Sequence, residues 1–194
     1  MSNETEIRGC IRSVLIACFV LFTCSQAVSA QRTMKGQLHI GAHASISADP
    51  RVPAGGELSF GSYLLDSYIT GWINVTRDYI TLPTSHQLGY IPINVGADYM
   101  YRVAATRSRS INLYVGGGVF LGCELYDPFK RLPSYIDTGF GKGTFIYGLA
   151  PAVVSEFFIA RTVALSLEAR MPVSFSSQAK IIKAHIKAGI RINI

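Results

Sequence analysis

Cysteine is scarce in this sequence, and its placement restricts the kinds of site that the chain can build. Four cysteines are present, but Cys10, Cys18 and Cys24 lie in or before an apolar segment near the amino terminus. Removal of that segment would leave Cys123 as the only cysteine. A single cysteine supports neither an internal disulfide nor a cysteine zinc site. We therefore expect Cys123 to behave as a small hydrophobic residue.

Long hydrophobic runs are missing from the rest of the chain. Hydrophobic residues make up 49% of the sequence and the mean hydropathy is +0.29. Nevertheless, no apolar run after residue 30 approaches the roughly twenty residues that a transmembrane helix needs. The apolar residues alternate with polar ones instead, which is the pattern of strands with two different faces. The composition therefore favours strands over helices as the elements that would contact a membrane.

The amino terminus carries the pattern of a secretory signal. Arg8 and Arg12 precede an apolar run that ends at Cys24, and small and polar residues follow this run. We predict cleavage after Ala30, which makes residues 1–30 a signal peptide. Two alternatives remain open, namely an uncleaved signal anchor and lipidation at Cys24. The apolar run is shorter than a membrane-spanning helix, which disfavours the anchor.

The end of the chain shows the strand pattern most clearly. From Lys183 to Ile194, basic and polar residues alternate with alanine and isoleucine. Side chains of a strand point alternately to opposite faces, so this segment has one apolar and one basic face. An apolar outer face combined with charge on the inner face is typical of a transmembrane β-barrel strand.

Similar alternation recurs along residues 31–194 and predicts a single domain. The eight expected strands lie at about residues 37–46, 57–65, 68–77, 91–103, 111–125, 144–158, 163–173 and 180–194. We therefore predict an all-β fold, an eight-stranded antiparallel up-and-down transmembrane β-barrel. Within it, Pro151 predicts a bulge or bend in the sixth strand.

The expected links between strands alternate in length. The first, third, fifth and seventh links are residues 47–56, 77–89, 126–141 and 176–179, and most of them are long. The links between them, residues 66–67, 104–110 and 160–162, are shorter. Outer-membrane barrels have short periplasmic turns and longer outer loops, and an even number of strands leaves both termini in the periplasm. We therefore expect an outer-membrane protein, exported through its signal peptide, with periplasmic termini and outward-facing long links.

The two faces of the strands predict what lies outside the barrel. Apolar residues, Cys123 among them, would face lipid, and aromatic residues near strand ends would form girdles at the membrane interfaces. The expected girdle residues are Tyr63, Tyr68, Trp72, Tyr79, Tyr90, Tyr101, Tyr114, Phe145, Tyr147 and Phe157. A soluble β-sandwich or lipocalin-like barrel also alternates, with its apolar face inward. The alternation by itself does not decide between these arrangements.

Charged residues on the polar face would meet inside a narrow lumen. Eight strands leave an interior just wide enough for side chains, and ions in a protein interior have to be paired and hydrogen-bonded. We expect an interior polar network of Asp98, Arg102, Glu124, Glu156, Glu168, Arg170, Lys183, His185, Lys187 and Arg191. We interpret this network as structural filling, with a proton or ion pathway as the alternative.

No residue pattern assigns a catalytic, cofactor-binding or metal site. His39 and His43 share a strand face, but their spacing separates them by about 13 Å, which is too far for one metal ion. Ser85, His86 and Asp78 are the only local group with the residue types of nucleophilic acyl chemistry. This group leaves an outer-membrane lipid-modifying enzyme as one alternative. We predict no enzymatic activity and no cofactor.

The formal net charge of +6 raises the question of nucleic-acid binding. The basic residues are scattered over the predicted links and strand interiors rather than clustered with aromatic residues. We therefore expect no direct nucleic-acid binding.

Three stretches resemble one protein family. The mature start Gln31-Arg32, the box Gly143–Gly148 and the ending Ala188–Ile194 are similar to the TraO conjugal transfer proteins of conjugative transposons. Size, signal and strand spacing match as well, so the resemblance covers nearly the whole mature chain. It implies a non-enzymatic outer-membrane component of a conjugal transfer, type IV secretion-like, apparatus, with a structural or docking role. The resemblance carries over no catalytic residue.

One position departs from this resemblance. Such proteins tend to end in an aromatic residue that the assembly machinery reads, whereas this chain ends in Ile194, which puts the efficiency of insertion in question. The implied partners are outer-membrane lipid and other proteins of the conjugation apparatus, and the sequence does not indicate an oligomeric state. A generic outer-membrane barrel for adhesion or envelope integrity is the main alternative.

Overall fold

The computed structural model describes residues 35–47, 55–81, 87–126, 143–177 and 181–194. The predicted signal peptide, Cys24, the Ser85–His86 pair and most of the link at 126–141 lie outside these residues. No helix in the described ranges is long and apolar enough to span a membrane.

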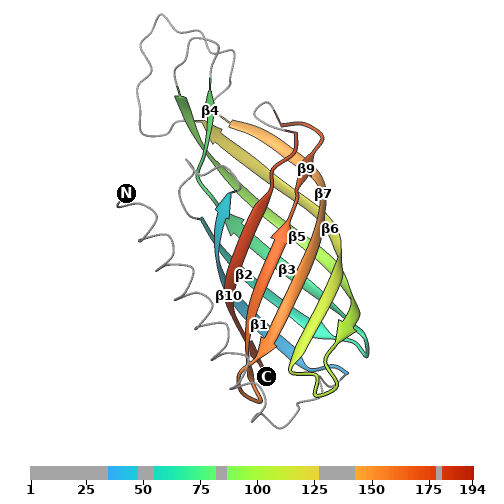
Figure 1. The fold of residues 1–194 in the computed structure, drawn as a ribbon. Coiled ribbons are helices and arrows are strands. Elements are labelled where there is room, and N and C mark those ends of the chain that lie inside the picture. Colours follow the sequence, from blue (N-terminus) through green and yellow to red (C-terminus); the bar gives the residue numbers. More distant parts are fainter. Residues whose placement is uncertain (1–34, 48–54, 82–86, 127–142, 178–180) are drawn as a thin grey trace, which may run out of the picture.

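All of the regular elements in the described residues are strands (Figure 1). They are β1 (Leu38–Ser47), β2 (Gly55–Tyr63), β3 (Ser67–Val75), β4 (Asp78–Thr81), β5 (Gln87–Ala105), β6 (Ile111–Tyr126), β7 (Gly143–Phe158), β8 (Val163–Arg170), β9 (Val173–Ser174) and β10 (His185–Asn193). Strands β5, β6 and β7 are the longest, with 19, 16 and 16 residues. One side of the molecule therefore has a taller wall than the other.

The strands form one closed antiparallel barrel. Their order is β3-β2-β1-β10-β8-β7-β6-β5, and pairing of β3 with β5 joins the two ends of this order. The short strands β4 and β9 follow β3 and β8 in the chain and pair with the same neighbours, β5 and β7. Of the ten strands, β4 and β9 are thus extensions, which leaves eight in the wall. The predicted eight-stranded up-and-down barrel is confirmed.

The links alternate between the two ends of the barrel. The turns at 64–66, 106–110 and 159–162 share one end with the start of β1 and the carboxyl end of the chain, because Leu38 N donates to Ile194 O at 3.2 Å. We call this the short-turn end. The opposite end, called here the long-loop end, is where β1, β4, β6 and β9 end and where β2, β5, β7 and β10 begin. The hairpin of β4 and the start of β5 rises above the rest of the wall there (Figure 1).

Several details differ from the sequence-based expectation. The long link at 77–89 is partly a hairpin of β4 and the start of β5, which extends the barrel wall. The last strand begins at His185, later than predicted. Of the bulge or bend predicted at Pro151, the bulge is wrong, because β7 pairs with β6 in continuous register. The strand on the other side of β7 is interrupted instead, because Met171 and Pro172 separate β8 from β9. A register shift occurs elsewhere, between Arg102 and Ala104 in the pairing of β5 with β6.

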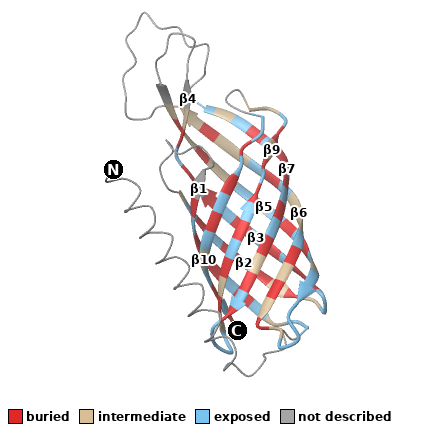
Figure 2. Cartoon of the chain, viewed as in Figure 1, coloured by how far each residue is buried: buried red, intermediate tan, exposed pale blue. Residues whose placement is uncertain are grey.

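Burial follows the alternation of each strand with polar residues inside (Figure 2). On β7, Phe145 is 62% exposed and its neighbour Ile146 is 1% exposed. Large apolar side chains cover the outer surface of every wall strand, whereas glutamate, aspartate, arginine and lysine are buried within. A water-soluble barrel would have the reverse arrangement. The closed fold therefore assigns the apolar face to the exterior, as transmembrane barrels do.

The predicted aromatic girdles are only partly present. Tyr101, Phe145, Tyr147 and Phe157 are on the exposed face, as expected. The prediction is wrong for Tyr63, Tyr68, Trp72, Tyr90 and Tyr114, which are at most 4% exposed. These five occupy inward positions of their strands, where their rings fill the lumen next to charged side chains.

Candidate functional site

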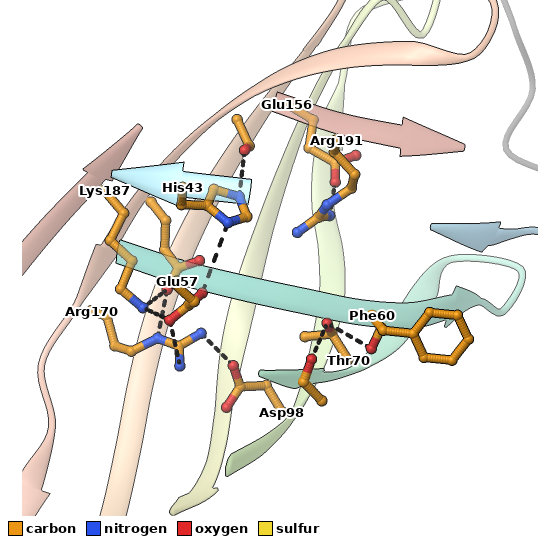
Figure 3. Close-up of polar contacts among 12 residues, drawn as sticks. His43, Glu57, Phe60, Thr70, Asp98, Glu156, Arg170, Lys187 and Arg191 are labelled. Atoms are coloured by element: carbon orange, nitrogen blue, oxygen red, sulfur yellow. Dashed lines mark hydrogen bonds and ion pairs between the residues drawn. The ribbon is translucent and has the colours of Figure 1, made fainter. Parts of the chain in front are cut away.

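The middle of the lumen holds a cluster of five charged side chains from four strands (Figure 3). We call it the ionic layer, and it consists of Glu57 on β2, Asp98 on β5, Glu168 and Arg170 on β8, and Lys187 on β10. All five are buried. Because the members come from strands far apart in the chain, the layer forms only when the barrel closes.

Arg170 bridges the carboxylates of the ionic layer. Its Nη2 donates to Asp98 Oδ2 at 2.5 Å and its Nε to Glu168 Oε1 at 2.5 Å, while Nη1 lies 4.0 Å from Glu57 Oε2. Lys187 contacts Glu57 and lies 3.2 Å from Glu168. Three carboxylates thus share two cations, and charge-assisted hydrogen bonds of this kind are stronger than neutral ones.

Trp72 packs against both cations of the ionic layer. The Arg170 guanidinium lies 4.2 Å from the ring centroid and the Lys187 ammonium 5.3 Å from it. A β-carbon on Gly96 would come within 2.4 Å of the Trp72 ring, so a larger residue there would displace the indole. Cation–π attraction supplements the ion pairs in a site removed from water.

His43 joins the ionic layer at its edge. Its Nε2 is hydrogen-bonded to Ser166 Oγ at 2.7 Å and its Nδ1 lies 3.9 Å from Glu57 Oε1. His39 lies elsewhere on β1, against the rings of Tyr63 and Tyr68. The two histidines therefore have separate surroundings. Among the residues that the structure describes, no three potential metal ligands gather into a metal-binding group.

A second layer near the short-turn end is mainly aromatic. We call it the aromatic layer; its members are Tyr63, Tyr68, Met100 and Tyr114, around the ion pair of Arg191 and Glu156. The Tyr63 hydroxyl donates to Glu156 at 3.0 Å, and the Arg191 guanidinium lies 4.7 Å from the Tyr68 ring. Tyr68 contacts Tyr63 and Tyr114 edge-to-face. One ion pair is thus enclosed by rings.

A third group of polar contacts lies towards the long-loop end. Glu124 contacts Lys183 and accepts hydrogen bonds from Tyr126 at 2.6 Å and Ser177 at 2.8 Å. The Lys183 ammonium also lies 5.0 Å from the Tyr90 ring. The carboxylate of this group therefore has both a counter-charge and hydroxyl donors.

The structure places the ten residues of the expected polar network as follows. Nine are buried, namely Asp98, Glu124, Glu156, Glu168, Arg170, Lys183, His185, Lys187 and Arg191. Arg102 is half-buried and pairs with exposed Asp66 at the short-turn end. His185 forms no ion pair in the described part of the chain, and its Nδ1 lacks a hydrogen-bond partner there.

Sequence reasoning missed several residues in and beside these layers, of which Glu57, Trp72 and Tyr63 are examples. Glu57 was assigned to a strand but not to the interior, although it alternates with Leu58 and Phe60 on β2. Trp72 and Tyr63 were placed in the girdles because aromatic residues suit membrane interfaces. Alternation against neighbouring apolar residues was the signal that could have assigned all three to the lumen.

The fold is similar to that of solved outer-membrane barrels. The N-terminal β-barrel domain of Pseudomonas aeruginosa OprF matches with a TM-score of 0.59 and 9% identity, over 82% of this chain and 98% of that one. A major outer membrane protein from Thermus thermophilus matches with 0.59 and 10%, over 82% and 99%. Neisserial surface protein A matches with 0.55 and 15%, over 81% and 96%. At these identities the likeness shows the fold alone.

The comparison with curated proteins found no match. The family described as "Conjugative transposon protein TraO" matches residues 78–194, from β4 through the last strand. This segment supplies β5 to β10 and therefore most of the wall and most of the ionic layer. The chain belongs to the conjugative transposon protein TraO family.

Proposed function

We propose that this protein is a non-enzymatic outer-membrane component of a conjugal transfer apparatus, with a structural or docking role. The observation that carries the proposal is the combination of family membership with a closed barrel that is apolar outside and ionic inside. The family supports a part in conjugative transposition, and the inverted polarity supports residence in a membrane.

The exterior supports insertion into a bilayer. Exposed apolar side chains such as Leu58, Val119 and Ile186, each more than half exposed, ring the barrel on strands β2, β6 and β10. Contact with water would make this surface a strong aggregation hazard. Contact with lipid instead of water removes this hazard, and a closed barrel leaves no unpaired sheet edge in the hydrocarbon. Export through residues 1–30 and an outer-membrane location with a periplasmic short-turn end complete the proposal.

The interior supports a rigid scaffold rather than a channel. Three groups of paired charges and aromatic rings occupy successive levels of the lumen, and a barrel of this strand number is just wide enough for side chains. Contacts with other conjugation proteins would then fall to the links at the two ends, because loops on a rigid scaffold are the usual binding elements.

A transfer assay tests this function. Donor cells would carry the conjugative element with this gene deleted and complemented by the wild type or by variants. We expect deletion to abolish or strongly reduce transfer, and wild-type complementation to restore it. A variant in which residues 127–142 are replaced by a glycine-serine segment of equal length should insert normally yet transfer poorly. Unchanged transfer after deletion would reject the proposed role.

Location is tested on the same cells. A folded outer-membrane barrel migrates faster on a gel unboiled than boiled, and it should fractionate with the outer membrane. Recovery of the folded protein from the soluble periplasm would reject the membrane proposal. Arg170→Met, which destabilises the ionic layer, provides a control in which transfer should fall in proportion to any loss of the fast-migrating form.

A further inference from the structure

The short-turn end carries an excess of basic side chains. Lys35, Arg107 and Arg161 are exposed there, and Arg109 is half-buried. We call these four residues the basic rim. Among the described residues, none of the four forms an ion pair, and the one acidic side chain in the turns of this end, Asp66, is paired with Arg102. The positive charge of the basic rim is therefore available to bind an anionic ligand.

Backbone hydrogen bonds bring two turns of the rim together. Phe158 N donates to Ser110 O at 2.8 Å, which places the β5–β6 turn beside the β7–β8 turn that contains Arg161. Within the first turn, the hydroxyls of Ser108 and Ser110 lie 2.7 Å apart and Thr106 Oγ1 accepts from Ile111 N at 3.1 Å. The arginines are therefore held on an ordered support.

Arg109 occupies a backbone conformation that arginine seldom adopts. Its φ is 55°, the one positive φ among the described non-glycine residues. Glycine would adopt this conformation without the strain that a β-carbon brings. Such strain is found at ligand-binding positions more often than elsewhere. Arginine therefore occupies a turn position at which glycine would have a lower conformational energy.

Exposed apolar side chains adjoin the rim. Leu65 is 70% exposed and Ile194 69%, and Val103 and Ile159 are also exposed near the same turns. In the proposed membrane orientation these residues mark the edge of the hydrocarbon. Basic side chains directly beyond that edge lie at the level of the lipid headgroups, which long cationic side chains reach readily.

We propose that the basic rim binds the phosphate groups of anionic glycerophospholipids in the leaflet at the short-turn end. This inference rests on the proposed membrane insertion. The continuity of the rim with the exposed apolar band favours lipid over an acidic protein, which would need a surface that projects from the membrane. Each basic residue close to an anionic membrane surface increases the affinity for that surface about fivefold.

Lipid selectivity in bilayers tests the proposal. The purified barrel would be placed in phosphatidylcholine bilayers containing spin-labelled phosphatidylglycerol or spin-labelled phosphatidylcholine, and the association of each with the protein would be compared. We expect the wild type to prefer phosphatidylglycerol by about fivefold or more, and added salt to reduce this preference. The triple variant Arg107→Gln, Arg109→Gly and Arg161→Gln should lose most of it.

Arg109→Gly separates lipid binding from structure. A purely structural role predicts equal or greater stability and unchanged selectivity, because glycine relieves the strained backbone. Lipid binding predicts reduced selectivity with stability retained. Arg77→Gln removes one exposed arginine beyond β3, towards the long-loop end, and should reduce selectivity less than Arg109→Gly.

The outcomes distinguish this inference from the proposed function. Fast gel migration of the unboiled samples reports insertion independently of lipid selectivity. An inserted wild type with no preference for phosphatidylglycerol overturns the lipid proposal and leaves the membrane proposal intact. Normal selectivity in the triple variant overturns it as well, and if transfer were nevertheless lost, the rim would bind an acidic partner instead. Failure of the wild type to insert would overturn both.

Discussion

The ionic layer and the aromatic layer solve the same problem in different ways. Both have to neutralise charge inside a narrow barrel. The ionic layer does so collectively, because Arg170 and Lys187 are shared among three carboxylates. The aromatic layer isolates one pair, Arg191 and Glu156, and surrounds it with phenol rings and a phenol hydroxyl. In the ionic layer, removing one cation therefore affects several carboxylates. In the aromatic layer, both charges of the pair can be removed together without leaving another charge unpaired.

The largest effect is expected from Arg170→Met. This change leaves Asp98 and Glu168 buried without their main donor, and breaking a buried ion pair costs about 3–5 kcal/mol of unfolding free energy. Urea unfolding in phospholipid bilayers would measure the loss. Arg77→Met, at an exposed position, is the matched control and should stay near the wild-type value. Similar stability of the two variants would show that the ionic layer contributes little.

Double variants compare the two layers directly. Arg191→Met should cost about 3 kcal/mol, and Arg191→Met with Glu156→Gln should regain about 2 kcal/mol because no buried charge remains alone. The corresponding pair in the ionic layer, Arg170→Met with Asp98→Asn, should regain less, since Glu168 still lacks its hydrogen bond from Arg170. The same unfolding measurement decides. Equal recovery in both layers would contradict the collective neutralisation of the ionic layer.

A smaller effect is expected from Tyr63→Phe in the aromatic layer. The change keeps the ring and removes the hydroxyl that donates to Glu156 at 3.0 and 3.2 Å. A hydrogen bond to a charged group contributes about 1.5–3 kcal/mol, and Arg191 still pairs with this carboxylate, so we expect about 1.5 kcal/mol. Tyr114→Phe is the control, because the Tyr114 hydroxyl, also in the aromatic layer, has no hydrogen-bond partner among the described residues. An equal loss in both variants would show that the hydrogen bond to Glu156 contributes little.

The smallest effect is expected outside both layers. Asp66→Asn removes the partner of Arg102 at the short-turn end, where Asp66 is largely exposed. Exposed ion pairs contribute about 0–1 kcal/mol, so the unfolding free energy should change by less than about 1 kcal/mol. A loss as large as that of Arg170→Met would show that charges at the rim are as important to the fold as those in the lumen.

Much of the fold could be predicted from alternation. Strands β6 and β7 were expected within one residue of their ends, because apolar and polar residues alternate along both, although less regularly along β7. The hairpin of β4 and β5 was missed, since its short segments lie in a stretch rich in loop-forming residues. The placement of Tyr63, Tyr68 and Trp72 was wrong because the preference of aromatic residues for interfaces was given more weight than their position in the alternation.

For most charged side chains of the candidate site, the sequence predicted that they face inward but not with which residue they pair. The basic face of the last strand and the acidic residues of other strands were visible in the sequence. Their partners were not, because Lys187 meets Glu57 across a sequence separation of 130 residues. Arg102 belonged to the inward series of β5 but pairs with Asp66 near the register shift that follows it.

The sequence by itself determined that each strand has one apolar and one polar face, because side chains alternate along any extended chain. It also determined the number of strands and the alternation of link lengths. Only the tertiary structure decided which face is inside. Pairing of β3 with β5 closes the sheet into a barrel. The sheet curves so that its polar face becomes the inner face, and this directs the charged side chains of the strands into the lumen. The partners of each ion follow from that closure and from the register between strands, which are properties of the whole barrel.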